Sequence, residues 1–583
     1  MNRRSFIQNT GIAAGAALPL LSSTKLFGAN GGSAARNGGA KTAAARSGRG
    51  TPNIQVGLDP FTGTLTPALA AHLLRRTGFG PRYSEVAAVV SNGNVAQIVQ
   101  SMLTATAAPT PPGPWVSTAP LLDGSNTSQT TNNTNMENFR EWWMGLIYSS
   151  GFPASTNVPN CLLEKMVLFW ANHFVSEYAK VKCPQYLYWQ NTLHRQYAFG
   201  SFKDYITQMS IDNAMLWYLD GYTNTVGSAN ENYAREEMEL FTMGPYDTTN
   251  LINPTAQAVP NYTQTDITNS ARANTGYQFT GGNKTPQALS QWTPGTYKAN
   301  LFDGSSKTYL GQTGNFGYTD IINIIFNQID APTQKNKVGL FICTKLYGLF
   351  VYDNPGTPGD PNYASYCNRT NPIIQAMADT FANNNFSISA VLQQLLTSQH
   401  FFDPSVIGAA IKSPVDFVVS ATRQFEILNA PNSYLYQQSA SFTGSGETQL
   451  DQPPNVKGFP GYETWISTAS LPARNQFTDS VFKNGISGAT PMDPIAFAKM
   501  VCNNDSTQYD NAYNLIKACA NFLLPFTLDN SDPNNSSSKM YALSNALLNG
   551  ASINDWSTSY PNAAQSIQAM LQLMCRLADF QLA

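Results

Sequence analysis

Apolar side chains recur every three to four positions along most of the chain, which is the spacing of one helix face. Residues 65–76 show this spacing, and Gly78, Gly80 and Pro81 follow at once as residues that end a helix. The same pattern predicts helices over residues 84–103, 137–150, 160–178, 228–244, 266–276, 318–328, 338–351, 372–382, 388–398, 414–427 and 563–582. We therefore expect a mainly α protein.

Polar stretches without apolar periodicity separate these helices. Residues 105–135 are rich in Pro, Thr, Ser and Asn, so we expect a loop there. Residues 245–262 have the composition of an inserted loop, and residues 277–317 combine Gly, Thr and Asn with possible short strands. The predicted fold class is a large multi-helix domain with long polar loops and a few short strands.

The first residues resemble an export signal for folded proteins. An Arg pair at residues 3–4 is followed by Phe and Ile, and residues 11–21 form an apolar run that is too short to span a bilayer. We expect a twin-arginine signal peptide over residues 1–35 and a flexible, Gly/Ala/Ser-rich linker over residues 36–60. The expected location is the periplasm or the cell surface.

Charged residues are scarce, at 12% of the chain, and the formal net charge is −2. Residues 1–50 contain seven Lys and Arg and no acidic residue, so the body keeps 27 basic against 36 acidic residues, a net charge of −9. A mildly acidic body argues against nucleic acid as a partner. Since no run approaches 18 apolar residues, no transmembrane anchor is expected either.

The seven cysteines are widely spaced and include no C-x-x-C pair, so zinc-ribbon spacing is absent. Their odd number leaves at least one thiol free if the others form disulfides. Cys161 and Cys343 lie in strongly apolar segments, and we expect both to be buried.

The chain has only four histidines. His173 follows Asn172 on an apolar helix, where it is either a hydrogen-bonded core histidine or a metal ligand or general base. His72 is expected to be structural. His194 and His400 lie near predicted helix ends, where they are expected to be caps or solvent-exposed side chains.

The strongest acidic cluster lies on the helix that a Ser228 capping box is expected to open. Glu231, Arg235 and Glu239 are spaced i, i+4 and i+8 and share one face, which predicts a ladder of ion pairs. In the alternative, Glu236 and Glu239 face inward with His173 and form a site for a divalent metal, as helical bundles do. The E-x-x-H spacing of di-iron bundles is absent, so we favour the ladder.

Familiar catalytic motifs are missing. The sequence contains no G-x-S-x-G, G-x-x-x-x-G-K-[ST] or H-E-x-x-H pattern, which leaves serine-hydrolase, P-loop and zincin chemistry unsupported. The loop P-P-N-V-K-G-F-P-G-Y-E-T-W at residues 453–465 contains Phe459, Tyr462 and Trp465. Its aromatic side chains either stack on the sugars of a surface glycan or pack the loop onto the core.

Several segments, in this order, resemble one bacterial family, the domain of unknown function 1800. They are residues 72–80 (H-L-L-R-R-T-G-F-G), 169–174 (F-W-A-N-H-F), 230–240 (N-E-N-Y-A-R-E-E-M-E-L), 262–267 (Y-T-Q-T-D-I), 307–311 (K-T-Y-L-G), 412–414 (K-S-P) and 453–458 (P-P-N-V-K-G). The resemblance implies a mainly helical, exported protein that is often encoded beside a sulfatase-like exported partner. It does not imply a known reaction.

The chain departs from the family pattern at two places. Residues 245–261 separate two motifs that the family usually joins closely, and Phe302-Asp303 stands where the family tends to carry His-Asp before K-T-x-L-G. A ligand or base at that histidine position would be lost in this protein.

Two functions remain open on the sequence. The favoured one is a non-catalytic surface binding or assembly protein of the cell envelope. The alternative is a hydrolase-like, metal- or cofactor-dependent enzyme with a site of His173, Arg235, Glu236 and Glu239. In either case we expect a helical family core over residues 61–430 and a C-terminal helical part over residues 431–583 that packs on it.

Overall fold

The computed structural model describes residues 57–583, except 105–106, 156–157, 254, 353–370, 442–449, 451, 460, 484, 529–534, 537 and 551. The expected signal peptide and most of the expected linker lie outside the described residues. Helices dominate the described chain, and the strands form short antiparallel pairs, which confirms the mainly α fold class.

The first half of the chain supplies the helices α2 (Pro67–Thr77), α3 (Tyr83–Asn92), α4 (Val95–Met102), η1 (Pro114–Ser117), α5 (Asn126–Ser149), α6 (Cys161–His173), α7 (Tyr178–Val181), α8 (Pro184–Tyr197), α9 (Phe202–Met209), α10 (Asn213–Tyr218), η2 (Gly221–Thr223), α11 (Glu231–Glu236), η3 (Glu237–Thr242), α12 (Thr249–Ile252) and α13 (Gln264–Ala273). The strand pairs follow: β1 (Tyr277–Gln278) with β2 (Thr296–Tyr297), β3 (Lys307–Tyr309) with β4 (Gln312–Gly314), and β5 (Ile329–Asp330) with β6 (Lys335–Asn336).

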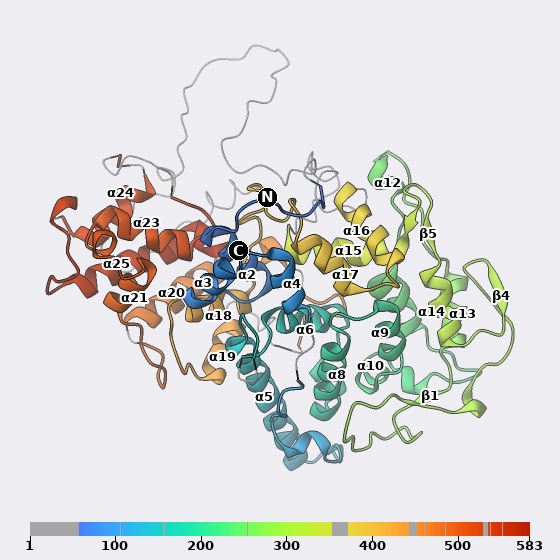
Figure 1. Cartoon of the computed structure of the whole chain (residues 1–583). Helices are drawn as coiled ribbons and strands as arrows, with labels where there is room; N and C mark the ends of the chain where they lie inside the picture. The colour runs from blue at the N-terminus through green and yellow to red at the C-terminus, as the bar shows by residue number, and fades with distance from the viewer. Residues whose placement is uncertain are drawn as a thin grey trace, which may run out of the picture.

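The remaining helices are η4 (Ala299–Leu301), α14 (Tyr318–Phe326), α15 (Lys337–Phe350), α16 (Pro372–Asn383), α17 (Ile388–Leu396), α18 (Pro414–Gln424), α19 (Asn432–Ser441), η6 (Tyr462–Trp465), α20 (Ser470–Lys483), α21 (Pro494–Val501), α22 (Ser506–Tyr509), α23 (Ala512–Leu523), α24 (Lys539–Leu548), η7 (Ile553–Asp555), α25 (Ala563–Arg576) and η8 (Ala578–Gln581). Figure 1 shows α23–α25 at one end of the molecule and α13, α14 and β4 at the other, with α2 and α6 between them.

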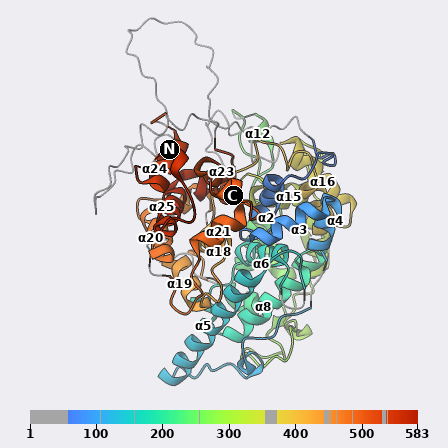
Figure 2. The ribbon, with the colours of Figure 1, turned by 60° about the vertical axis from the view of Figure 1, so that its left-hand side comes forward.

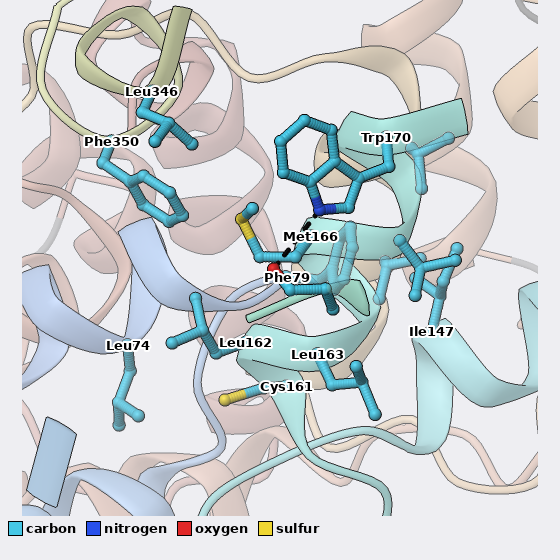
Figure 3. Packing of buried hydrophobic residues seen from close by; sticks show 14 of the residues in the cluster. Leu74, Phe79, Ile147, Cys161, Leu162, Leu163, Met166, Trp170, Leu346 and Phe350 are labelled. Atoms are coloured by element: carbon cyan, nitrogen blue, oxygen red, sulfur yellow. Dashed lines mark hydrogen bonds between the residues drawn. The ribbon is translucent and has the colours of Figure 1, made fainter. Parts of the chain in front are cut away.

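Helix α6 lies at the centre of the apolar core. Asn160 caps its first turn by accepting the Leu162 backbone N–H at 3.0 Å, and the apolar run that follows is buried on almost every side. Figure 3 shows its Met166 and Trp170 among side chains from α2, α5 and α15. Because this helix is central, its C-terminal residues meet polar groups from several distant segments.

The first family-like motif joins helices through buried polar groups. Arg76 of α2 donates to the carbonyl oxygens of Leu349 and Phe350 at the end of α15, at 2.7 and 2.8 Å. Gly80 has φ +86°, and a Cβ there would lie 2.4 Å from the Ser420 side chain of α18. Arg76 thus ties α2 to α15, and a glycine at position 80 allows the chain to pack closely on α18.

Arg423 of α18 completes this junction. Its Nη2 donates to both oxygens of the Glu85 carboxylate, at 2.7 and 2.8 Å, while Nε and Nη1 donate to the Gly80 and Tyr148 carbonyl oxygens at 2.8 Å. Both members of the pair are almost fully buried. The hydrogen bonds satisfy a charge that would otherwise be costly to bury.

Two sequence expectations about helix boundaries are wrong. The loop expected over residues 105–135 ends early, because Ser125 caps α5. A tertiary contact stabilises this polar helix, since the Tyr178 hydroxyl donates to the Asn133 side-chain oxygen at 2.9 Å. The first turns of α5 project beyond the other helices (Figure 2). The helix expected over residues 84–103 is divided into α3 and α4 by Gly93, which has φ +68°.

The C-terminal helices contact one another and also the rest of the molecule. Helices α24 and α21 both pack on α25, while α23 contacts α2 and α20 contacts α18. The division at residues 430 and 431 stays a prediction. None of the described helices is both long enough and apolar enough to cross a membrane.

Candidate functional site

The C-terminal end of α6 presents Asn172 and His173 to segments far away in the sequence. His173 is 4% exposed, and its Nε2 donates to the Phe241 carbonyl oxygen at 3.1 Å. A carbonyl oxygen carries no proton, so Nε2 must be the protonated nitrogen of the ring. Nδ1 is then the acceptor for the Lys345 ammonium, whose Nζ lies 3.0 Å away.

The partner helix of His173 changes its winding in the middle. Asn230, rather than the expected Ser228, caps it by accepting from the Asn232 N–H at 2.9 Å. Helix α11 is followed directly by η3, which is a π-helix. Such wider turns are rare and frequently occur at functional sites.

Side chains from α6 and α15 bind the carbonyl groups of this π-helix. Phe241 O accepts from His173, and Leu240 O accepts from Lys345 Nζ at 3.3 Å. Gly244 ends the π-helix, and its N–H donates to Met238 O at 3.0 Å. The irregular winding is therefore stabilised by groups that are more than 65 residues away along the chain.

Lys345 of α15 was not among the residues predicted for a site. It is partly buried, and its Nζ lies 4.7 Å from the centre of the Phe341 ring. Burial lowers the pKa of Lys345 to about 8. Burial, and next the charge of Lys345, hold the pKa of His173 well below its ordinary value, so its imidazole is neutral.

The ion-pair ladder is half confirmed. Arg235 and Glu231 form a pair at 3.5 Å, with both side chains exposed to solvent. Glu239 does not continue the ladder, because η3 shifts the register, and it accepts instead from the Tyr262 hydroxyl at 3.1 Å. Burial, followed by the charge of Glu239, raises the pKa of the partly buried Glu236.

The fully buried acid on this helix is Glu237, which the sequence did not single out. It accepts from the Ser270 hydroxyl at 3.3 Å, and within the described residues its Oε1 has no hydrogen-bond partner. Burial raises the pKa of Glu237 to about 8. Glu237 follows the buried Tyr233 by four positions and the buried Ala234 by three, so it lies on the same inward face of the helix.

The loop at residues 453–465 docks on α6 through its backbone. The Phe459 N–H donates to the Asn172 side-chain oxygen at 2.7 Å. Gly458 has φ +82°, and a Cβ there would lie 2.5 Å from the backbone oxygen of Asn172. Lys457 is exposed, and its positive charge lowers the pKa of Glu236, against the rise that burial causes.

The aromatic residues of this loop are only partly placed by the structure. Phe459 and Trp465 are partly exposed, and their ring centres lie 6.2 Å apart. The side chain of Tyr462 lies outside the described residues, although its backbone belongs to η6. The loop is therefore anchored to the core and still offers part of its aromatic surface to solvent.

The remaining histidines are buried, so the expectation of solvent-exposed His194 and His400 is wrong. His194 hydrogen-bonds the Tyr205 hydroxyl, and His400 hydrogen-bonds the Tyr347 hydroxyl at 3.0 Å. His72 donates to Phe401 O at 3.0 Å, which is the structural role expected for it. All three contribute to helix packing.

Phe302 stands at the position of the missing family histidine, and its ring centre lies 5.1 Å from Lys307 Nζ. The neighbouring Asp303 makes a structural contact. Asp303 pairs with Arg272 at 2.7 Å, and hydrogen bonds from Arg272 are the main reason that the pKa of Asp303 is far below its ordinary value. Asp303 thereby ties α13 to the segment before β3. The negative charge of Asp303 is therefore balanced by Arg272 within the protein.

The structure thus brings some of the predicted site residues together. His173 meets the Glu231–Glu239 segment at the backbone of η3, whereas the carboxylates of Glu236 and Glu239 make no hydrogen bond to it in the described chain. Across the residues that the structure describes, no three His, Cys, Asp or Glu side chains are grouped so as to hold a metal ion. The metal hypothesis stays a prediction.

Three family-like motifs therefore converge at one place: residues 169–174, 230–240 and 453–458. A family model described as "Protein of unknown function (DUF1800)" matches residues 72–582. Neither a curated protein nor a solved structure matches the chain. Because the family model covers most of the chain, this protein belongs to the DUF1800 family.

Proposed function

We propose that this protein is exported to the bacterial cell envelope, where it binds a neutral glycan without catalysing a reaction. The observation that carries the proposal is the docking of the 453–465 loop on Asn172. It places Lys457 beside Glu236, and partly exposed aromatic rings follow in the same loop. We call this group the loop surface and define it by Glu236, Glu239, Lys457, Phe459 and Trp465.

The loop surface has the chemistry that sugars need. The half-buried carboxylates accept hydrogen bonds from hydroxyl groups, and such charge-assisted bonds are about twice as strong as neutral ones. Partly exposed aromatic rings offer apolar faces for the C–H side of a sugar ring. The negative charge of the body and of these carboxylates argues for neutral rather than acidic glycans.

Glycan binding is tested with an array of neutral oligosaccharides of glucose, mannose and N-acetylglucosamine, followed by titration with the best ligand. We expect Phe459→Ala and Glu236→Gln each to weaken binding by about tenfold, which corresponds to about 1.4 kcal/mol. Tyr560→Ala is the control, because Tyr560 is 49% exposed and far along the chain from this loop. No binding to the array, or equal effects of all three variants, contradicts the proposal.

Export in the folded state is supported by the leader and by the cysteines. The six cysteines in the described part of the chain are buried and unpaired, and burial raises the pKa of Cys161 and Cys183 to about 12. Such a core forms in a reducing compartment without disulfide exchange. We expect Arg3→Lys with Arg4→Lys to retain the protein in the cytoplasm, as measured by cell fractionation, and unchanged export contradicts the twin-arginine route.

A hydrolase-like enzyme is the second candidate, and the unequal environment of a carboxyl pair favours it. Glu236 has a raised pKa beside Glu239, as a general acid next to a carboxylate does. Hydrolysis of a bound oligosaccharide by the wild type but not by Glu236→Gln would assign the site to an enzyme. For the metal version, elemental analysis of the mature protein and of His173→Ala is the measurement that decides.

The family resemblance also implies a sulfatase-like exported partner. If the protein assembles with one, co-expression and tag purification recover both chains in a fixed ratio. Recovery of this chain alone contradicts that assembly and leaves glycan binding unaffected.

A further inference from the structure

Three tyrosine rings from separate segments meet at Tyr277. Tyr277 of β1 pairs directly with Tyr297 of β2, and the centres of the two rings lie 5.4 Å apart. Tyr318, the first residue of α14, approaches Tyr277 edge-on, with ring centres 5.1 Å apart. Burial and then the nearby Tyr318 raise the pKa of Tyr277, so the hydroxyl groups of this pair lie close together. We call Tyr277, Tyr297 and Tyr318 the tyrosine cluster.

The tyrosine cluster is open to solvent. Tyr297 is 45% exposed, and Tyr277 and Tyr318 are both partly exposed. Strand β1 and helix α14 belong to the end of the molecule that lies opposite α23–α25 (Figure 1). A reagent in solution therefore reaches Tyr297 without any movement of the fold.

Contact and exposure do not coincide at four other tyrosines. Tyr197 stacks on Tyr205 with ring centres 5.4 Å apart, but Tyr205 is 0% exposed. Tyr246 and Tyr560 are 45% and 49% exposed, yet within the described residues neither ring contacts another aromatic ring. The tyrosine cluster combines the two properties that these residues have only singly.

We propose that Tyr277 is the centre of an oxidative cross-linking site, where it forms an internal dityrosine bond with Tyr297 or Tyr318. The oxidant is hydrogen peroxide acting through a peroxidase. Each of the two phenols gives up one electron and one proton, a bond forms between one ortho carbon of each ring, and the hydrogen on each of these carbons then moves to the oxygen. Hydrogen peroxide takes up the two electrons and the two protons and becomes two molecules of water. The reaction is independent of glycan binding at the loop surface.

The geometry favours a bond within one molecule. Tyr277 takes part in both ring contacts, so it is the partner of whichever neighbour is oxidised first. The carbons that couple are the neighbours of the hydroxyl-bearing carbons, and the hydroxyl groups of Tyr277 and Tyr318 are already close. An exposed tyrosine without such a neighbour has to meet a second protein molecule before it can couple.

The bond acts as a covalent staple on β1. It ties β1 either to β2 or to the start of α14, and it therefore closes a loop in the unfolded chain. Closing a loop lowers the conformational entropy of the unfolded state, as a disulfide does. The cysteines in the described part of the chain are unpaired, so this staple would not duplicate a disulfide there.

The test treats dilute full-length protein with a haem peroxidase and hydrogen peroxide. The monomer is isolated by size-exclusion chromatography, its dityrosine fluorescence is measured, and peptide mass spectrometry identifies the cross-linked residues. We expect a monomer in which Tyr277 is joined to Tyr297 or Tyr318. Tyr277→Phe keeps the ring and should lose the fluorescence of the monomer, whereas the control Tyr560→Phe should keep it, with circular dichroism checking that both variants are folded.

Urea unfolding of the treated monomer is the second measurement. We expect the treated wild type to unfold at a higher urea concentration than Tyr277→Phe treated in the same way, because only the wild type carries the staple. Dityrosine found in covalent dimers alone, or monomer fluorescence that Tyr277→Phe retains, overturns the cross-linking site. Equal urea midpoints for the two treated monomers overturn the staple.

Discussion

Buried charges in this protein are held in two different ways at the scale of single residues. Arg423 and Glu85 form a pair whose hydrogen bonds are nearly all satisfied. Glu237 and Lys412 are buried without an ion-pair partner among the described residues, and the Lys412 Nζ contacts the Phe580 ring at 4.2 Å instead. The first kind fixes helix packing, whereas the second kind makes stability depend on pH.

Removing one member of the buried pair should be costly. We expect Glu85→Gln to lower the free energy of unfolding by about 3–5 kcal/mol, because Arg423 would keep a buried and uncompensated charge. Asp379→Asn is the matched control, since it breaks an ion pair whose acid is 47% exposed and should cost less than about 1 kcal/mol. Urea unfolding measures both, and equal costs contradict the distinction.

Gly458 is a second residue whose identity the structure explains. Gly458→Ala places a Cβ in a left-handed conformation and against Asn172, so we expect it to detach the loop and to weaken glycan binding by more than tenfold. Gly227→Ala has almost the same φ, +79°, with open space around the Cβ. It should cost only about 1 kcal/mol in stability and leave binding unchanged. Similar binding by both variants argues against the docked loop as the site.

At the scale of elements, η3 shows how distant groups stabilise an irregular helix. Its winding leaves the carbonyl oxygens of Leu240 and Phe241 to accept from Lys345 and His173. On the same segment, Glu237 lies on the inward face with Tyr233 and Ala234, whereas Glu239 lies near Tyr262. One helical segment thus carries both the buried acid and the partly exposed carboxylates.

His173→Phe tests this arrangement. The variant keeps a ring but leaves Phe241 O without its donor, so we expect a loss of about 1–3 kcal/mol and faster hydrogen exchange of the amides in η3. His194→Phe removes an equally buried ring whose hydrogen bond goes to Tyr205. It should lower stability without changing exchange in η3. Unchanged exchange in His173→Phe shows that the π-helix does not need this contact.

At the scale of the whole molecule, buried groups give opposite contributions to the pH dependence of stability. Glu237 has a pKa of about 8 in the folded state and 4.5 ordinarily, so the native protein holds a proton that the unfolded chain releases. Its contribution is complete below pH 4.5 and is lost as the pH rises to 8. Lys412, with a pKa of about 7, contributes stability that rises between pH 7 and 10.5.

Glu237→Gln should therefore flatten the profile on the neutral side. Between pH 5 and 7 we expect the free energy of unfolding of the wild type to fall by up to about 1.4 kcal/mol per pH unit relative to the variant. Urea unfolding at a series of pH values measures the difference. Lys412→Met is the control, since its effect should appear only above pH 7. Parallel profiles for wild type and Glu237→Gln contradict a protonated Glu237.

Much of the fold could be predicted because its signals are local. The apolar spacing of residues 160–178 and 338–351 indicated α6 and α15, and the order of motifs indicated the family. The polar start of α5 was missed because it is stabilised by tertiary contacts such as the hydrogen bond from the Tyr178 hydroxyl to the Asn133 side-chain oxygen at 2.9 Å. The helix propensity of the local sequence does not indicate such a contact between distant residues.

The candidate site was predicted only in part, for a similar reason. His173 and the Glu231–Glu239 segment do meet, yet the contact uses a backbone carbonyl and not a carboxylate. Lys345 reaches the same place from a helix that is 172 residues further along the chain. Side-chain spacing on a regular helix predicts neighbours at i+4, and it fails where a π-helix changes the register.

By itself, the sequence determined the helical class, the family and the segments that carry its motifs, because periodicity and motif order are properties of the chain. Only the tertiary structure decided which polar groups are buried and what they bind. It selected Glu237 over Glu236 as the buried acid and placed Lys345 on His173. The physical reason is that burial and hydrogen-bond partners depend on how distant segments pack.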